Sequence, residues 1–223
     1  MVTATVIAID GPVASGKTAV GRLLGQKLGY RFLDTGIMYR ALAWIALERG
    51  MNPKDSAGMV KLAHERSTKV VFQQNGDVTV LVNQTDVTPY LWYQDIEDRV
   101  SLVAQVAGVR EVLVEQQRSI GQGGLVVMVG RDIGTVVLPD AQLKVFLAAS
   151  IAERARRRHA EFQALGRDLS YQRVLYDLEE RDRLDSERKI APLRPASDAR
   201  IVLTDDRSVE GVVDLIMKLL GHD

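Results

Sequence analysis

The sequence predicts an α/β fold with a doubly wound, parallel sheet of five strands. Short apolar runs rich in β-branched residues recur along the chain, helical stretches separate them, and 46% of the 223 residues are hydrophobic. Such runs are typical of strands buried on both faces of a parallel sheet, and their alternation with helices is the pattern of repeated βα units. The chain length fits one domain of this class with an insertion, or two small domains.

The elements follow in a regular order. The first predicted strand covers residues 3–10, and a glycine-rich loop joins it to a helix with apolar residues at helical spacing and an end at Gly29. A second strand over residues 30–34 leads into a second helix, which we expect to end at Gly50. Further strands are predicted at residues 124–130, 143–149 and 199–205.

Residues 68–83 break this rhythm. They alternate apolar and polar side chains on both sides of Asn75-Gly76, which is a strong signal for a β-hairpin. We therefore predict that residues 49–96 form a small, β-rich inserted subdomain. The remaining core is then predicted to consist of residues 1–48 and 97–223.

Charge, cysteine content and hydropathy exclude several classes of protein. The 29 basic residues balance 29 acidic ones, whereas a dedicated nucleic-acid-binding domain usually has a pI above ~9. The chain has no cysteine, so disulfides, thiol nucleophiles and thiolate zinc sites are excluded. We find neither a secretory leader nor an apolar run of the ~20 residues that a membrane helix needs. We therefore expect a soluble, cytoplasmic monomer without a nucleic-acid or membrane partner.

Residues 11–18, GPVASGKT, match the phosphate-loop pattern G-x-x-x-x-G-K-[ST] between a predicted strand and a predicted helix. Gly11 and Gly16 allow backbone N–H groups to surround an anion, and the helix N-terminus adds partial positive charge. Lys17 can then reach the β- and γ-phosphates of a nucleoside triphosphate, and the Thr18 hydroxyl can ligate Mg²⁺. The alternative is a chance glycine-rich turn. The pattern does not identify the phosphate acceptor.

The sequence lacks the characteristic motifs of two other classes of nucleotide-binding protein. A switch GTPase needs a base-reading motif of the N-K-x-D kind, and the sequence contains none. A motor or helicase ATPase needs an apolar strand that ends directly in an acidic residue. The nearest segment is VVMVGRD, in which Arg131 comes before Asp132.

Residues 33–40, LDTGIMYR, place Thr35, Tyr39 and Arg40 around a strand-to-helix junction. This junction lies at the carboxyl edge of the predicted sheet, where ligands of open α/β folds bind. Thr35 is equally a good helix N-cap residue. At this point capping and ligand binding are both open.

Arginines also gather near the C-terminus. Arg181, Asp185 and Arg188 lie at i, i+4 and i+7, which places them on one face of a predicted helix. That face is either a solvated surface with an ion pair, or a wall of two guanidiniums and a carboxylate that binds a phosphate and a sugar. The arginine-rich residues 153–168 follow a predicted strand and are expected to form a mobile lid.

Together these segments resemble the bacterial type of cytidylate kinase, which phosphorylates CMP and dCMP with ATP. The most specific matches are GRDIGTVV followed by LPDA, and ERDRLDSERKIAPL. Further matches are IDGPVASGKT, FLDTGIMYRALAWIAL and ERARRR, and the resemblance runs over residues 5–220. It implies a phosphate-loop kinase whose insert binds the nucleoside monophosphate and whose lid covers ATP.

The resemblance also implies roles for individual residues. ATP, with Mg²⁺, would be bound by Asp10, Gly11, Pro12, Val13, Ala14, Ser15, Gly16, Lys17, Thr18, Arg154 and Arg157. CMP or dCMP would be bound by Thr35, Tyr39, Arg40, Ser101, Arg110, Asp132, Arg181, Asp185 and Arg188. The catalytic positive charges would come from Lys17, Arg40, Arg131, Arg158 and Arg181.

Within these sets the implied contacts are more specific. Ser101, Arg110 and Arg188 would face the cytosine, and Asp132 would orient Arg188. Asp185 would meet the ribose hydroxyls. Thr18 would ligate Mg²⁺ directly, and we expect Asp34 to hold one of its water ligands.

Two positions depart from the family pattern. Val13 stands where a small or polar residue is more common, which bears on the fine geometry of the loop. Asp206 stands where we expect a hydroxyl residue near the adenine edge.

Other functions are possible alternatives. Within kinases they are shikimate kinase and adenylate kinase. The β-rich insert and the GRD and ERDxxD elements argue against both. The alternative outside enzymes is an RNA-binding module. Balanced charge and the absence of an aromatic-basic ribbon argue against it.

Overall fold

The chain forms a large parallel sheet and a small antiparallel one, as predicted. The computed structural model describes residues 5–65, 67–73 and 76–221. The large sheet has the strand order β2-β6-β1-β7-β8, and all of its neighbours are parallel. Its strands are β1 (Val6–Asp10), β2 (Arg31–Asp34), β6 (Val126–Gly130), β7 (Leu143–Ala148) and β8 (Arg200–Leu203). All five predicted strands are present, although residues 3 and 4 of the first lie outside the described part.

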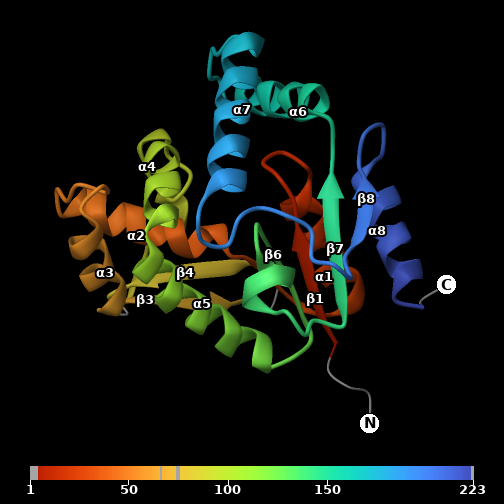
Figure 1. Ribbon diagram of the computed structural model, residues 1–223, viewed down its shortest axis with the longest axis horizontal. Coiled ribbons are helices and arrows are strands. Elements are labelled where there is room, and N and C mark those ends of the chain that lie inside the picture. Colours follow the sequence, from red (N-terminus) through yellow and green to blue (C-terminus); the bar gives the residue numbers. More distant parts are fainter. Residues whose placement is uncertain (1–4, 66, 74–75, 222–223) are drawn as a thin grey trace.

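Helices cover both faces of the large sheet (Figure 1). Successive strand residues point to opposite faces, so β1 contributes Ile9 to one buried cluster and Ala8 to the other. The cluster that contains Ile9 packs against α1 (Lys17–Leu28) and α8 (Val209–Leu219). The cluster that contains Ala8 packs against α2 (Gly36–Glu48), α5 (Ala107–Gln122) and the π-helical turn η2 (Ile133–Val137). Among the described residues, no helix is long and apolar enough to cross a membrane.

The small sheet contains the predicted hairpin. Its strands are β3 (Thr68–Phe72), β4 (Val78–Val82) and β5 (Thr85–Asp86), and Val70 pairs with Val80. Asn75 of the predicted Asn75-Gly76 turn lies outside the described residues. Helix α3 (Ser56–His64) precedes the hairpin and was not predicted, although Asp55 Oδ1 caps it by accepting a hydrogen bond from Gly58 N (3.1 Å).

The insert shares a hydrophobic core with the rest of the chain. Met59 of α3 and Val80 of β4 belong to the same buried cluster as Leu42 of α2 and Leu113 of α5. The 3₁₀ turn η1 (Thr88–Tyr90) then leads to α4 (Gln94–Gln105), which contains Ser101 as predicted. The division of the chain into an insert at residues 49–96 and a core stays a prediction.

Two helices, α6 (Ile151–Ala164) and α7 (Tyr171–Glu187), stand above the carboxyl ends of the large sheet (Figure 1). They pack on each other through a cluster that contains Ala155, Phe162, Val174 and Leu178. The predicted lid, residues 153–168, is therefore most of α6 and the start of its connection to α7. Its mobility stays a prediction.

Helix α7 ends one residue before Arg188, so the prediction of a continuous helix face is wrong at that residue. The ψ of Arg188 is 138°, which is not helical. The physical reason is Pro192, because in a continued helix the proline ring would clash with the carbonyl group of Arg188, four residues earlier. The Arg188 side chain nevertheless turns back, and its Nη1 lies 4.0 Å from Asp185 Oδ1.

Candidate active site

The phosphate loop joins β1 to α1. Gly16 is the N-cap residue of α1 and has a φ of 91°, which favours glycine. A Cβ on Gly11 would lie 2.3 Å from the carbonyl oxygen of Leu147, so the loop passes too close to β7 for a side chain there. Lys17 Nζ is folded over the loop, where it donates to the carbonyl oxygen of Pro12 and to Ser15 Oγ (3.3 Å).

Lys17 lies in an environment that disfavours its positive charge. Burial lowers its pKa well below the usual value, and the nearby charge of Arg131 lowers it further. An anion in the loop would counter both effects. The two cations therefore fit the prediction that this loop binds a phosphate.

Arginines of α6 support the loop through protein contacts. Arg154 Nη1 donates to the carbonyl oxygen of Val13 (3.3 Å), and its Nη2 forms an ion pair with Asp182 Oδ2 of α7 (2.5 Å). Arg157 Nη1 donates to Thr204 Oγ1 (3.0 Å). Both arginines thus fix the surroundings of the loop. Their direct contact with ATP stays a prediction.

Val13, the first departure from the family pattern, and Asp205, the residue before the second departure at Asp206, both contact the start of α6 or its surroundings. Val13 packs against the cluster of α6 and α7, which gives its larger side chain an apolar environment. Asp205 accepts hydrogen bonds from Ser150 N (3.1 Å) and Ser150 Oγ (2.5 Å), and Ser150 is the N-cap residue of α6. Val13 and Asp205 therefore help to place α6, and the effect of Asp206 at the adenine edge stays a prediction.

Asp10, a predicted ATP ligand, is buried beneath the loop. Its carboxylate accepts hydrogen bonds from Ile133 N (2.7 Å) and Gly134 N (2.8 Å), which tie β1 to the turn after β6. Burial raises the pKa of Asp10 to about 6, although the two hydrogen bonds lower it. The nearby charge of Asp132 raises it further. These bonds give Asp10 an anchoring role, and contact with ATP stays a prediction that they do not support.

We expect Asp10 to make the protein more stable in mild acid. Its folded pKa of about 6 lies above its usual value of 3.8, so its stabilising contribution is complete below pH 3.8 and is lost as the pH rises through about 6. Urea unfolding should show that the stability of the wild type relative to Asp10→Asn is greater by about 2 kcal/mol at pH 4.5 than at pH 7. A difference that does not change with pH would contradict this expectation.

A cavity of about 80 Å³ at the carboxyl edge of β2 and β6 brings most of the predicted acceptor residues together. It is smaller than the ~300–1,000 Å³ of usual ligand pockets, so acceptor binding must separate its walls. Arg40 is the predicted acceptor residue that does not line it. Those that do are Thr35, Tyr39, Ser101, Arg110, Asp132, Arg181, Asp185 and Arg188.

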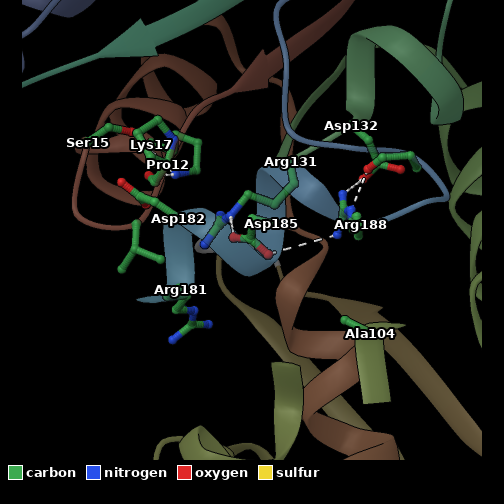
Figure 2. A network of polar contacts seen from close by, with 12 residues as sticks. Pro12, Ser15, Lys17, Ala104, Arg131, Asp132, Arg181, Asp182, Asp185 and Arg188 are labelled. Carbon is green, nitrogen blue, oxygen red and sulfur yellow. Dashed lines mark hydrogen bonds and ion pairs between the residues drawn. The ribbon is translucent and has the colours of Figure 1, made fainter. Parts of the chain in front are cut away.

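A chain of ion pairs runs along this cavity (Figure 2). Arg131 Nε donates to Asp185 Oδ2 (2.7 Å), which lowers the pKa of Asp185 against the effect of burial. Arg188 Nη2 lies 3.6 Å from Asp132 Oδ1, and Arg110 Nη2 donates to Asp132 Oδ2. Asp132 therefore holds both arginines that are predicted to face the cytosine.

Both of these arginines have a buried donor without a hydrogen-bond partner. The atoms are Arg110 Nε and Arg188 Nη2. Buried polar groups are normally satisfied, and leaving one unpaired costs roughly 1–3 kcal/mol. The ring of Tyr39 lies 5.6 Å from the Arg110 guanidinium and completes this wall. A flat ligand with carbonyl acceptors fits these donors.

The strand-to-helix junction excludes helix capping by the Thr35 side chain, and ligand binding by Thr35 stays a prediction. Its hydroxyl does not cap α2, because Thr35 Oγ1 donates to the carbonyl oxygen of Val129 (3.0 Å). Asp34 takes that place, with Oδ1 accepting from Gly36 N (3.0 Å). The second oxygen, Asp34 Oδ2, accepts from Thr18 Oγ1 (2.6 Å). This pairing of a hydroxyl and a carboxylate fits Mg²⁺, which prefers oxygen ligands.

Glu97 of α4 is a residue of the site that the sequence analysis missed. Its carboxylate forms ion pairs with Arg40 Nη1 (2.8 Å), Arg158 Nη2 (3.1 Å) and Arg181 Nη1 (2.8 Å). Burial would raise the pKa of Glu97, but the arginines, led by Arg40, lower it well below its usual range. Nothing in the local sequence separates Glu97 from Asp95 or Asp98, so only the tertiary structure reveals it.

Comparison with known proteins identifies the family. A model of the cytidylate kinase family matches residues 7–222. The chain belongs to the cytidylate kinase family. The cytidylate kinase of Herpetosiphon aurantiacus is 46% identical, over 99% of this chain and 96% of that protein, and the cytidylate kinase of Pelotomaculum thermopropionicum is 46% identical, over 95% and 93%. The chain is therefore a kinase that phosphorylates CMP or dCMP.

Solved structures agree on the fold alone. A shikimate kinase from Bacteroides thetaiotaomicron superimposes with a TM-score of 0.51 at 16% identity, over 97% of this chain and 98% of that one. An uncharacterised protein from Eubacterium ventriosum gives a TM-score of 0.54 at 12% identity, over 99% of this chain and 100% of that one. Both support the α/β fold.

Proposed function

We propose that this cytidylate kinase transfers the γ-phosphoryl group of ATP, bound at the phosphate loop, to CMP or dCMP, giving CDP or dCDP. One observation carries the proposal. Arg110 and Arg188 are both held by the carboxylate of Asp132, each has a buried nitrogen that makes no hydrogen bond, and both line a cavity that Arg131 also lines. Such a wall suits a pyrimidine with carbonyl acceptors.

On the donor side, the loop and its cations bind the triphosphate. Lys17 would contact the transferred phosphoryl group, and Arg131 lies close enough to share its charge. Mg²⁺, held by Thr18 and by a water on Asp34, would neutralise phosphate charge when bound. Arg158 of the lid would complete the positive surroundings of the phosphoryl group.

On the acceptor side, the phosphate of CMP is itself the nucleophile. One of its oxygens forms the new bond to the γ-phosphorus while the bond from that phosphorus to the β,γ-bridging oxygen breaks, and ADP leaves. The attacking phosphate is largely dianionic near neutral pH, so no general base is needed. Arg40, Arg181 and Thr35 would hold this phosphate, and Asp185 would accept from the ribose hydroxyls.

Alignment and exclusion of water supply most of the catalysis in such a reaction. The lid helices would close over ATP, and the insert would carry the acceptor toward it. All of the proposed contacts come from one chain, so a monomer is sufficient.

The test is ADP release from ATP and Mg²⁺ with CMP, dCMP, UMP, AMP, GMP and shikimate as acceptors. Turnover should be strong with CMP and dCMP and weak with the other four. Preferred turnover with a different acceptor, or turnover with none, would overturn the proposed reaction.

Asp34→Asn should raise the Mg²⁺ concentration for half-maximal activity by about tenfold, because it removes the charge that orients a metal-bound water. The asparagine oxygen can still accept from Gly36 N, so the start of α2 should persist. Asp140→Asn, an exposed carboxylate before the amino end of β7, is the control and should change nothing. An unaltered Mg²⁺ requirement in Asp34→Asn would remove Asp34 from the proposed site.

A further inference from the structure

Glu97 joins three separate helices through a single carboxylate. Arg40 comes from α2, Arg158 from α6 and Arg181 from α7, and all three reach the Glu97 oxygens within 3.1 Å. The side chains are well shielded, with exposed fractions of 13% for Glu97, 9% for Arg40 and 22% for Arg181. Glu97 is thus the partner of three arginines that are proposed to bind phosphate.

A carboxylate and a phosphate offer guanidinium groups the same chemistry, namely charged oxygens that accept strong hydrogen bonds. Arg158 also pairs with Glu161 (2.8 Å), which leaves Arg40 and Arg181 to share the carboxylate of Glu97. Two guanidinium groups on one carboxylate leave a net positive charge that a dianionic phosphate would balance better. Arg40 is fixed independently, because it also donates to the carbonyl oxygen of Leu91 (3.2 Å) and lies 4.5 Å from the Trp92 ring.

Arg181 lies between two cavities. It lines both the acceptor cavity and a larger one of about 750 Å³, which also contains Glu97 and Arg158. Its ion pair with Glu97 draws the guanidinium toward the larger cavity, and Figure 2 shows the side chain directed away from Asp185 and Arg188. Release from Glu97 would let Arg181 turn into the acceptor cavity.

We propose that Glu97 takes the place of the acceptor's phosphate in the substrate-free enzyme and gives up Arg40 and Arg181 when CMP binds. Glu97 is a positioning residue: it keeps the arginines ordered and paired until the phosphate replaces it. This inference rests on the proposed phosphate-binding roles of Arg40 and Arg181. A carboxylate that only braced the helices would stay in place, and its loss would weaken CMP binding.

The two roles of Glu97, as a substitute for the phosphate or as a brace between helices, predict opposite changes in CMP affinity when its charge is removed. We would determine the dissociation constants of CMP and of cytidine, which lacks the phosphate, by calorimetry for the wild type and for Glu97→Gln. Removing a competing charge should lower the dissociation constant of CMP by about fivefold and leave that of cytidine unchanged. The matched control is Asp95→Asn on the same helix, whose side chain is 74% exposed, and both of its constants should equal those of the wild type.

A dissociation constant for CMP that is unchanged or higher in Glu97→Gln would overturn the inference, as would an equal gain for cytidine. If the Gln variant does not fold, Glu97→Asp keeps the charge on a side chain too short to span three guanidiniums. It should lower the constant for CMP by about twofold, and an unchanged or higher constant would again overturn the inference. Failure of the wild type to bind CMP would be a different result, because it would refute the proposed function first.

Discussion

Lys17→Met is expected to lower kcat about a thousandfold while leaving CMP binding intact, because the lysine acts on charge that develops at the transferred phosphoryl group. Lys17 lies at the start of α1 with its ammonium group over the loop, 3.3 Å from Ser15 Oγ. Methionine fills a similar volume without the charge. The acceptor cavity does not include Lys17, so the affinity for CMP has no reason to change.

The stability of this variant should not fall. Burial lowers the pKa of Lys17, so its charged form is held in the fold at a cost that methionine does not carry. The control is Lys27→Met on the same helix, where the lysine is 41% exposed and pairs with Asp214 at 2.8 Å. Steady-state kinetics and thermal unfolding measure both variants. A fall in kcat of less than tenfold for Lys17→Met would contradict the proposed role.

The parts of the protein that the sequence predicted are those with a local signature. The phosphate loop combines fixed glycines, a preceding buried strand and a following helix within residues 6–28, and all three are present. The strands β1, β6, β7 and β8 each contain an apolar run, and the hairpin shows a period of two. Each pattern depends on neighbouring residues, so the sequence alone carries it.

The parts that were missed depend on contacts between distant segments. Glu97 and Arg181 are 84 residues apart, and no periodicity links them. The carboxylate of Asp10 is engaged by backbone amides more than 120 residues later, which only the register of β1 against β6 brings near. The end of α7 was different, because Pro192 gave a local signal for it.

The acceptor cavity depends both on local sequence motifs and on contacts between distant segments. The motif around Arg131 and Asp132 marks a turn at the end of β6, and the motif around Asp185 and Arg188 marks the end of α7. Their meeting through the ion pairs of Arg131 with Asp185 and of Asp132 with Arg188 is a tertiary result. Family resemblance implied the contact of Asp132 with Arg188 but not that of Arg131 with Asp185. Spacing alone did not decide between a binding wall and a solvated helix face.

Arg188→Met is expected to lower kcat/KM for CMP by about 10²–10³, because a site built from hydrogen-bonding groups discriminates through them. The variant removes a buried guanidinium whose Nη2 makes no hydrogen bond and lies 3.6 Å from Asp132 Oδ1. Asp132 keeps its ion pair with Arg110, so no carboxylate is left buried and unpaired, and the fold should persist. Hydrolysis of ATP without an acceptor should be unaffected, since the phosphate loop is untouched.

Arg183→Met is the matched control for this variant, because Arg183 lies on α7 shortly before Arg188, is 51% exposed and pairs at the surface with Glu180 and Glu187. Exposed ion pairs contribute about 0–1 kcal/mol, so its kcat/KM should stay within about twofold of the wild type. Equal losses in the two variants would mean that α7 contributes through general positive charge and not through Arg188 at the base. Because Arg110 and Arg188 share Asp132, loss of Arg188 should also relax the preference for CMP over UMP, and the same acceptor panel measures that change.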